Sequence, residues 1–133
     1  MDKPTKKLRK ILVTQALPYA NAPLHLGHIL EAVQTDIWTR YQNLNGHECL
    51  FFCADDTHGT PVMLKAKEMN ISPEELIKDV YEDHKTTYEL YGINFTNFYS
   101  THSDENKSFS EEIYIKAKEN KLISKEIVQQ LFD

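Results

Sequence analysis

The chain has 133 residues, of which 41% are hydrophobic and 26% are charged, and its formal net charge is −5. This composition is ordinary for a soluble globular protein. The negative net charge argues against a protein whose main surface binds nucleic acid through the phosphates. No run approaches the roughly 18 consecutive apolar residues of a membrane span, and the basic N-terminus lacks the apolar stretch of a secretory signal. We therefore expect a cytoplasmic protein with no membrane partner.

The first predicted element is a short buried strand, because residues 11–14 form a continuous apolar and β-branched run. A loop rich in Pro and Asn follows, and it ends at His25-Leu26-Gly27-His28. A helical period of apolar residues begins there, and Gly46 is placed to end the helix. The apolar residues that define the period are Leu26, Ile29, Leu30, Val33, Ile37, Tyr41 and Leu44.

The two histidines are predicted to lie at the start of this helix. Backbone N–H groups are unpaired there and the helix dipole is positive, so the position suits a phosphate group. A strand, a loop and a His-x-Gly-His helix start together predict a nucleotide site and nucleotidyl transfer. The alternative is that the histidines only cap the helix.

A second buried strand is predicted at residues 49–54, so the order strand, helix, strand indicates a right-handed crossover in a parallel sheet. Cys49 and Cys53 would share one face of this strand, too far apart for a disulfide, and no second pair completes a zinc site. Residues 54–61, Ala-Asp-Asp-Thr-His-Gly-Thr-Pro, follow at the carboxyl end of the strand. Ligands bind at that edge in open α/β sheets.

Further elements complete an α/β pattern of three strands and four helices, with one weak strand after it. Thr60 is predicted to cap a helix to residue 69, and Ser72-Pro73-Glu74-Glu75 opens another as a capping box. A strand at 97–101, a helix capped by Ser103 and a weak strand at 122–132 follow. No linker or repeat marks an internal boundary. We expect residues 1–133 to form the N-terminal half of a doubly wound, Rossmann-like parallel sheet with an open edge.

Two long motifs in this order carry a resemblance to a known family. Ala-Leu-Pro-Tyr-Ala-Asn before the paired histidines and Cys-Ala-Asp-Asp-Thr-His-Gly-Thr-Pro after the next strand resemble the methionyl-tRNA synthetases. That family belongs to the class I aminoacyl-tRNA synthetases. The similarity runs from about residue 11 to residue 133 and includes residues 100–103. Leu26 stands where the family motif usually has isoleucine, a change that preserves packing.

The resemblance implies a methionine–tRNA ligase, which forms methionyl-adenylate from methionine and ATP and passes the methionyl group to tRNA. It implies that His25 and His28 are catalytic and donate hydrogen bonds to the phosphate of ATP. Gly27 would leave room for the nucleotide, and Glu31, one turn later, would reach it. A solvated helix position is the alternative for Glu31.

The same resemblance implies a methionine site. Asp56 would hold the α-amino group, with the Leu17 carbonyl beside it and Tyr19 against the side chain. The residue types alone leave Asp55 and Asp56 equally suited to hold an ammonium group, and both could simply occupy a turn.

Three features of the family are missing from this chain, and their absence limits the activity that we expect of it. The lysine-rich signature loop, the zinc knuckle and the anticodon-binding domain come later in the family's chains, so this chain is expected to carry the ATP and methionine half-site of a longer protein and to be weak or inactive alone. Mg²⁺ would accompany ATP, zinc would belong to the region beyond this chain, and no metal is expected here.

Two other functions remain open from the sequence. One is a small His-x-Gly-His nucleotidyltransferase that acts on an alcohol or phosphate acceptor. The other is a non-catalytic module that binds a nucleotide or a partner.

Overall fold

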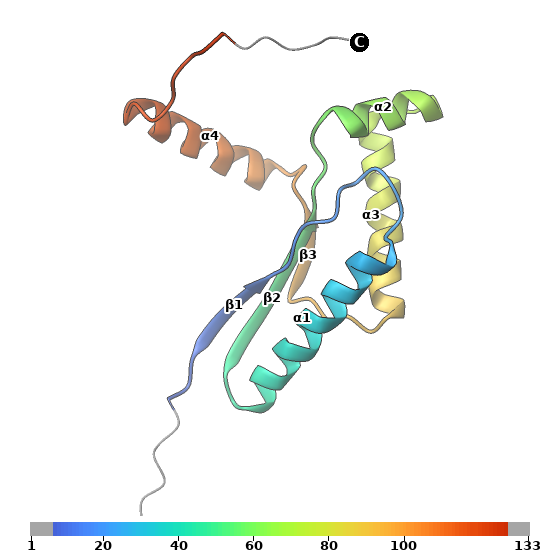
Figure 1. Ribbon diagram of the computed structural model, residues 1–133, viewed down its shortest axis with the longest axis vertical. Coiled ribbons are helices and arrows are strands. Elements are labelled where there is room, and N and C mark those ends of the chain that lie inside the picture. The colour runs from blue at the N-terminus through green and yellow to red at the C-terminus, as the bar shows by residue number, and fades with distance from the viewer. Residues whose placement is uncertain (1–6, 128–133) are drawn as a thin grey trace, which may run out of the picture. The chain divides into compact units, whose positions relative to one another are not determined.

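The computed structural model describes residues 7–127, and the contacts divide the chain into two compact units, Met1–Thr101 and His102–Asp133. The described part of the first unit contains a sheet and the helices packed on it, and that of the second contains one helix (Figure 1). The elements are β1 (Lys10–Thr14), α1 (Leu26–Leu44), β2 (Glu48–Asp55), α2 (Thr60–Met69), α3 (Pro73–Leu90), β3 (Asn97–Ser100) and α4 (Asp104–Glu119).

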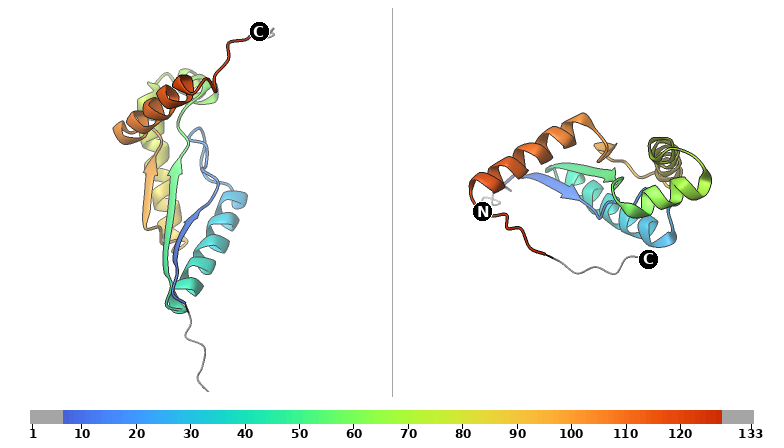
Figure 2. Two further views of the ribbon diagram at one scale, coloured as in Figure 1. Left: turned by 90° about the vertical axis from the view of Figure 1, so that its left-hand side faces the viewer. Right: turned by 90° about the horizontal axis from the view of Figure 1, so that it is seen from above.

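The three strands form a parallel sheet in the order β1-β2-β3, which confirms the predicted α/β fold. In the register, Thr14 pairs with Phe52, and Asp55 pairs with Ser100. Both α1 and α3 lie on the same side of this sheet (Figures 1 and 2). The carboxyl ends of all three strands therefore meet at one edge, where a ligand site is expected.

The sheet is buried on one face. Along β2 the buried residues alternate, so that Cys49, Phe51, Cys53 and Asp55 all face α1 and α3. The two cysteines share this face and are free thiols, as predicted. The prediction that the strand at 11–14 is buried is wrong, because no residue of β1 is buried and Leu12 is 69% exposed. A continuous apolar run is typical of strands covered on both faces, and here α1 and α3 cover only one.

The helical period placed α1 correctly, but the apolar residues that define it are mostly exposed. Leu30, Ile37 and Tyr41 are each about 60% exposed. The buried stripe instead carries small and polar residues, among them Asp36, which accepts a hydrogen bond from the Asn94 N–H at 3.0 Å. One side of α1 therefore packs on the sheet, and a broad apolar side of the helix remains uncovered.

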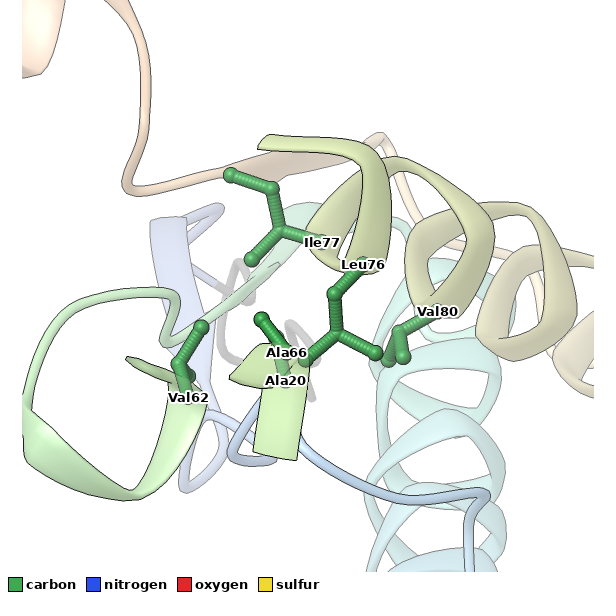
Figure 3. Close-up of a cluster of buried hydrophobic side chains, with 6 residues drawn as sticks. All are labelled: Ala20, Val62, Ala66, Leu76, Ile77 and Val80. Atoms are coloured by element: carbon green, nitrogen blue, oxygen red, sulfur yellow. The ribbon is translucent and has the colours of Figure 1, made fainter. Parts of the chain in front are cut away.

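Two apolar clusters hold the helices on this frame. The first joins Phe51 of β2 to α1 and to Tyr88 of α3, with Phe95 and Phe98 packed against it. The second joins α2 and α3 to the loop after β1 (Figure 3). Its members are Ala20, Val62, Ala66, Leu76, Ile77 and Val80. Ala20 is completely buried there, so this cluster anchors the end of the Ala-Leu-Pro-Tyr-Ala-Asn motif.

Most predicted helix ends are observed, with one correction. Ser72 caps α3 by accepting a hydrogen bond from the Glu75 N–H at 3.0 Å, and Gly92 follows the helix at φ +68°. The cap of α2 is Gly59, not Thr60, which is already helical. No side chain caps α2, because the cap residue is a glycine, here with φ +123°.

The second unit is described by itself. Ser103 caps α4 as predicted, accepting from the Asn106 N–H at 3.2 Å. No residue of α4 is buried. The strand predicted at 122–132 is not formed over 122–127, and the remainder of it lies outside the described residues. Within residues 7–127, no helix is both long enough and apolar enough to cross a membrane.

Candidate functional site

The two sequence motifs meet at the carboxyl edge of the sheet. A parallel bridge pairs Tyr19 with Asp56, beyond the last residues of β1 and β2. The Asp56 N–H donates to the Pro18 carbonyl, and the Ala20 N–H donates to the Asp56 carbonyl, each at 2.8 Å. The backbones of the first and second motifs are therefore joined directly, although their sequences are almost 40 residues apart.

His25 and His28 cap the helix that they open. Nδ1 of His25 accepts from the Gly27 N–H at 3.1 Å and from the His28 N–H at 3.4 Å, while Nδ1 of His28 accepts from the His25 N–H at 3.4 Å. The two rings stack with their centroids 3.7 Å apart. This is a reciprocal capping box, with histidines in the places usually taken by Ser or Thr and Glu or Gln.

The cap determines the chemistry of the two rings. A nitrogen that accepts a hydrogen bond carries no proton, so each neutral ring has its proton on Nε2. Burial, followed by the neighbouring His25, lowers the pKa of His28, which favours that neutral form. Each ring thus offers one N–H donor at Nε2, and no described residue accepts from either. Beside the unpaired N–H groups of the helix start, these donors suit an anionic oxygen.

Gly27 makes this cap possible. A Cβ at this position would lie 2.9 Å from Cε1 of His25, closer than real Cβ atoms approach a ring. The His25 imidazole folds over the first turn of α1 and lies beside Gly27. That Gly27 also leaves room for a nucleotide stays a prediction.

Tyr19 ties the loop after β1 to the loop after β2 a second time. Its hydroxyl donates to the His58 carbonyl at 2.5 Å. The hydroxyl end of Tyr19 lies against Gly59, where an added Cβ would come too close to the hydroxyl oxygen and where φ is +123°. Gly59 is therefore required both by its backbone conformation and by the close approach of Tyr19.

Replacing Gly59 by Ala is expected to lower the free energy of unfolding by at least about 1–3 kcal/mol, the cost of holding a non-glycine residue in this region. The contact with Tyr19 adds a steric cost. Urea unfolding measures the loss. Gly92→Ala is the matched control, because Gly92 also has positive φ but nothing lies within 4 Å of an added Cβ. Equal losses in the two variants would contradict the close contact with Tyr19.

Asp55 and Asp56 have different environments, although they are neighbours. Asp55 is completely buried, and its Oδ1 lies 2.8 Å from Nδ1 of His84 on α3. Asp56 is half-buried at the edge, where its backbone joins the first motif. Asp55 is thus committed to an internal partner, and Asp56 is the carboxylate of the two that a ligand can reach.

His84 completes a buried chain of polar contacts. Its Nε2 lies 2.9 Å from the Ala22 carbonyl, and the side chain is 1% exposed. Burial alone would lower the pKa of His84, but its hydrogen bonds to Asp55 and Ala22 outweigh burial and raise that pKa. Sequence analysis missed this residue as a functional one, because a histidine on the apolar side of a helical pattern resembles an ordinary core position.

This pair predicts that the free energy of unfolding falls as the pH rises above about 6.5, the ordinary pKa of His. The folded state holds the proton of His84 more tightly than the unfolded state, so the stabilisation is complete below 6.5 and is lost as pH rises through the folded pKa. Burial also raises the pKa of Asp55, which acts in the same direction. Besides Asp55, the charges that act on His84 include Asp83 of α3 and His28 of α1.

Urea unfolding of the wild-type chain at pH 6, 7, 8 and 9 tests this dependence. Asp55→Asn is the control, because a neutral side chain no longer raises the pKa of His84. The fall in stability with pH should be smaller in this variant. Identical slopes for both proteins would contradict the assignment.

The remaining predicted residues lie around the same edge. Oε1 of Glu31 accepts from the Ala16 N–H at 2.8 Å, so this side chain holds the end of β1 against α1. Leu17, the next residue, is 42% exposed. Gln15 was given no role by the sequence. It is buried, and its Nε2 donates to the Tyr88 hydroxyl at 3.4 Å.

Comparison with known proteins gives a consistent result. The family described as tRNA synthetases class I (M) matches residues 11–133. The structure is similar to the agnB2 LeuRS of Agrobacterium radiobacter K84, solved as a ternary complex with tRNA and LeuAMS, with a TM-score of 0.81 and 21% identity over 90% of this chain. It is also similar to the methionyl-tRNA synthetase of Mycobacterium tuberculosis in complex with methionyl-adenylate, with a TM-score of 0.80 and 24% identity over 84% of this chain. The chain spans 16% and 22% of the lengths of these two proteins.

Proposed function

The chain belongs to the class I tRNA synthetase family, and from this premise we propose that it carries the ATP and methionine half-site of a methionine–tRNA ligase. The observation that carries the proposal is the meeting of the two motifs at one edge of the sheet. Backbone hydrogen bonds join the segment that carries the accessible carboxylate of Asp56 to the segment that leads to the histidine pair at the start of α1.

ATP is proposed to bind with its phosphates at the start of α1. The Nε2–H groups of His25 and His28 supply neutral donors, and the helix dipole favours the negative charge. Glu31 is proposed to support the ATP site indirectly, because its Oε1 already accepts a hydrogen bond from the Ala16 N–H. Mg²⁺ is expected to arrive with ATP. Within residues 7–127 no cluster of three or more His, Cys, Asp or Glu side chains could hold a metal ion.

Methionine is proposed to bind beside the Tyr19–Asp56 bridge. The half-buried carboxylate of Asp56 suits the α-amino group, because an ionised carboxylate is a strong acceptor for an ammonium. The Leu17 carbonyl and the ring of Tyr19 complete the proposed contacts. The hydroxyl of Tyr19 is already bonded to His58, so its contribution to the substrate would be the ring.

The proposed reaction needs positioning more than acid–base catalysis. The methionine carboxylate is ionised at neutral pH and can attack the α-phosphorus of ATP without a general base, and pyrophosphate leaves. Two fixed donors would stabilise the charge on the phosphoryl oxygens as the bond forms. Transfer of the methionyl group to tRNA is proposed for the longer protein.

The test is ATP–pyrophosphate exchange by the chain, with circular dichroism to confirm folding. We expect slow exchange that depends on methionine and is absent with leucine, the amino acid named in the LeuAMS complex. Exchange that depends on a phosphorylated acceptor would instead support a small His-x-Gly-His nucleotidyltransferase. Nucleotide binding by a folded chain that neither binds methionine nor shows exchange for any amino acid would support a non-catalytic module.

A further inference from the structure

The loop that joins the two halves of the proposed site has few contacts of its own. Residues 21–24 lie between the Tyr19–Asp56 bridge and the His25 cap. Leu24 packs against the apolar core. Among the described residues, the bond between the Ala22 carbonyl and His84 is the one hydrogen bond that ties residues 21–24 to another element.

His84 reaches this loop from α3. It lies in the middle of α3, and both of its ring nitrogens are engaged, Nδ1 with Asp55 and Nε2 with the Ala22 carbonyl. A carbonyl oxygen can only accept, so Nε2 carries a proton. A carboxylate on the other nitrogen orients the ring, as carboxylates orient histidines in many catalytic and metal sites.

We propose that His84 is a positioning residue: its Nε2–H holds the Ala22 carbonyl and thereby places His25 and His28, while Asp55 keeps the ring aimed. The proposal deepens the function proposed above and rests on it for its effect on catalysis. The residues before Ala22 have separate anchors, because Tyr19 is held by His58 and by the bridge to Asp56. Loss of the Ala22 bond should therefore disturb the histidine pair more than the methionine contacts.

The electrostatics of the pair agree with this role. Hydrogen bonds to Asp55 and Ala22 raise the pKa of His84 in spite of its burial, so the ring keeps the proton that the Ala22 bond requires. Asp55 has a second oxygen, Oδ2, that is buried without a partner among the described residues. A buried carboxylate with only one partner depends strongly on that partner.

Helix α3 supplies a control for structural effects. Tyr88 lies one turn after His84 on the same side of the helix, is equally buried, and makes one polar contact, with Gln15 at the end of β1. Its hydrogen bond involves neither the 21–24 loop nor the histidine pair, although Leu24 packs against the apolar cluster to which Tyr88 belongs. Tyr88→Phe removes its polar atom from the same core without touching the proposed connection.

Two substitutions separate the two bonds of His84. In His84→Asn the amide nitrogen takes the place of Nδ1, so the donor to Asp55 remains and the bond to Ala22 is lost. In His84→Gln the amide nitrogen takes the place of Nε2, so the bond to Ala22 remains and the donor to Asp55 is lost. Each variant is compared with wild type and Tyr88→Phe by NMR of the His25 and His28 imidazoles and by methionine-dependent exchange, after its folding is confirmed.

We expect His84→Asn to shift the imidazole signals of His25 and His28 and to lower kcat by about a hundredfold, the scale of a 1 Å misplacement, with a small change in KM for methionine. His84→Gln should retain most of the wild-type signals and rate at a lower stability, and Tyr88→Phe should leave both readouts unchanged. Wild-type signals and kcat in a folded His84→Asn variant would overturn the proposal.

The NMR measurement separates this proposal from the proposed function, because it needs no substrate. If the wild-type chain shows exchange with another amino acid and none with methionine, the methionine assignment fails while the imidazole signals still decide the role of His84. If His84→Asn does not fold, the proposal is tested on the wild-type chain by the exchange rate of the His84 Nε2–H. A slowly exchanging Nε2–H signal of His84 at neutral pH supports the bond to Ala22, and rapid exchange of that proton with water overturns it.

Discussion

His25→Ala is expected to lower the rate of adenylate formation by about a hundred- to a thousandfold, the effect of removing one well-placed donor to a developing charge. Methionine affinity should change little, because the proposed methionine contacts come from other residues. His28→Ala should behave alike. Methionine-dependent pyrophosphate exchange gives the rate, and calorimetric titration with methionine gives the affinity.

The double role of His25 calls for a matched variant. His25→Ala removes the helix cap as well as the donor, and loss of a cap costs about 0.5–2 kcal/mol. His25→Asn should keep the cap, since an Asn side chain accepts from the same N–H groups, but it lacks the Nε2 donor. The rate should fall in both variants, whereas stability should fall mainly in His25→Ala. A wild-type rate in His25→Asn would mean that His25 is only a cap.

Asp55→Ala is expected to destabilise the fold by about 3–5 kcal/mol, because it leaves the buried, protonated His84 without its partner. Asp56→Ala should change stability by only about 0.5 kcal/mol, as is usual for side chains away from such networks, and should abolish methionine binding. Urea unfolding and methionine titration measure the two effects. Loss of methionine binding in a folded Asp55→Ala variant with normal binding in Asp56→Ala would reverse the assignment.

The fold was predictable because its signals are local. The strands at 11–14 and 49–54 are short apolar runs, and the helix between them has a clear period with a glycine at its end. A crossover between two such strands has one strongly favoured hand and leads to a parallel pair. The burial of the strands was not predictable in the same way, because it depends on which faces the helices cover.

The site was predictable in part, for a similar reason. His25 and His28 lie three positions apart at a helix start, so their position follows from the sequence pattern alone. The contact between Asp55 and His84 joins residues 29 positions apart in sequence, and no pattern in the sequence near His84 predicts this contact. Likewise, the space beside Gly27 belongs to a ring whose rotamer only the folded chain reveals.

The bridge between Tyr19 and Asp56 also has a consequence for how the chain folds. It extends the pairing of β1 with β2, in which Lys10 lies opposite Glu48, so it closes a loop of almost forty residues. Contacts so distant in sequence form slowly, and they form together with the sheet rather than before it. Because the bridge continues the pairing of β1 with β2, a chain whose helices are formed but whose strands are unpaired lacks the site. Native hydrogen exchange at Asp56 and Ala20 would then report the same opening event as exchange in the middle of β2.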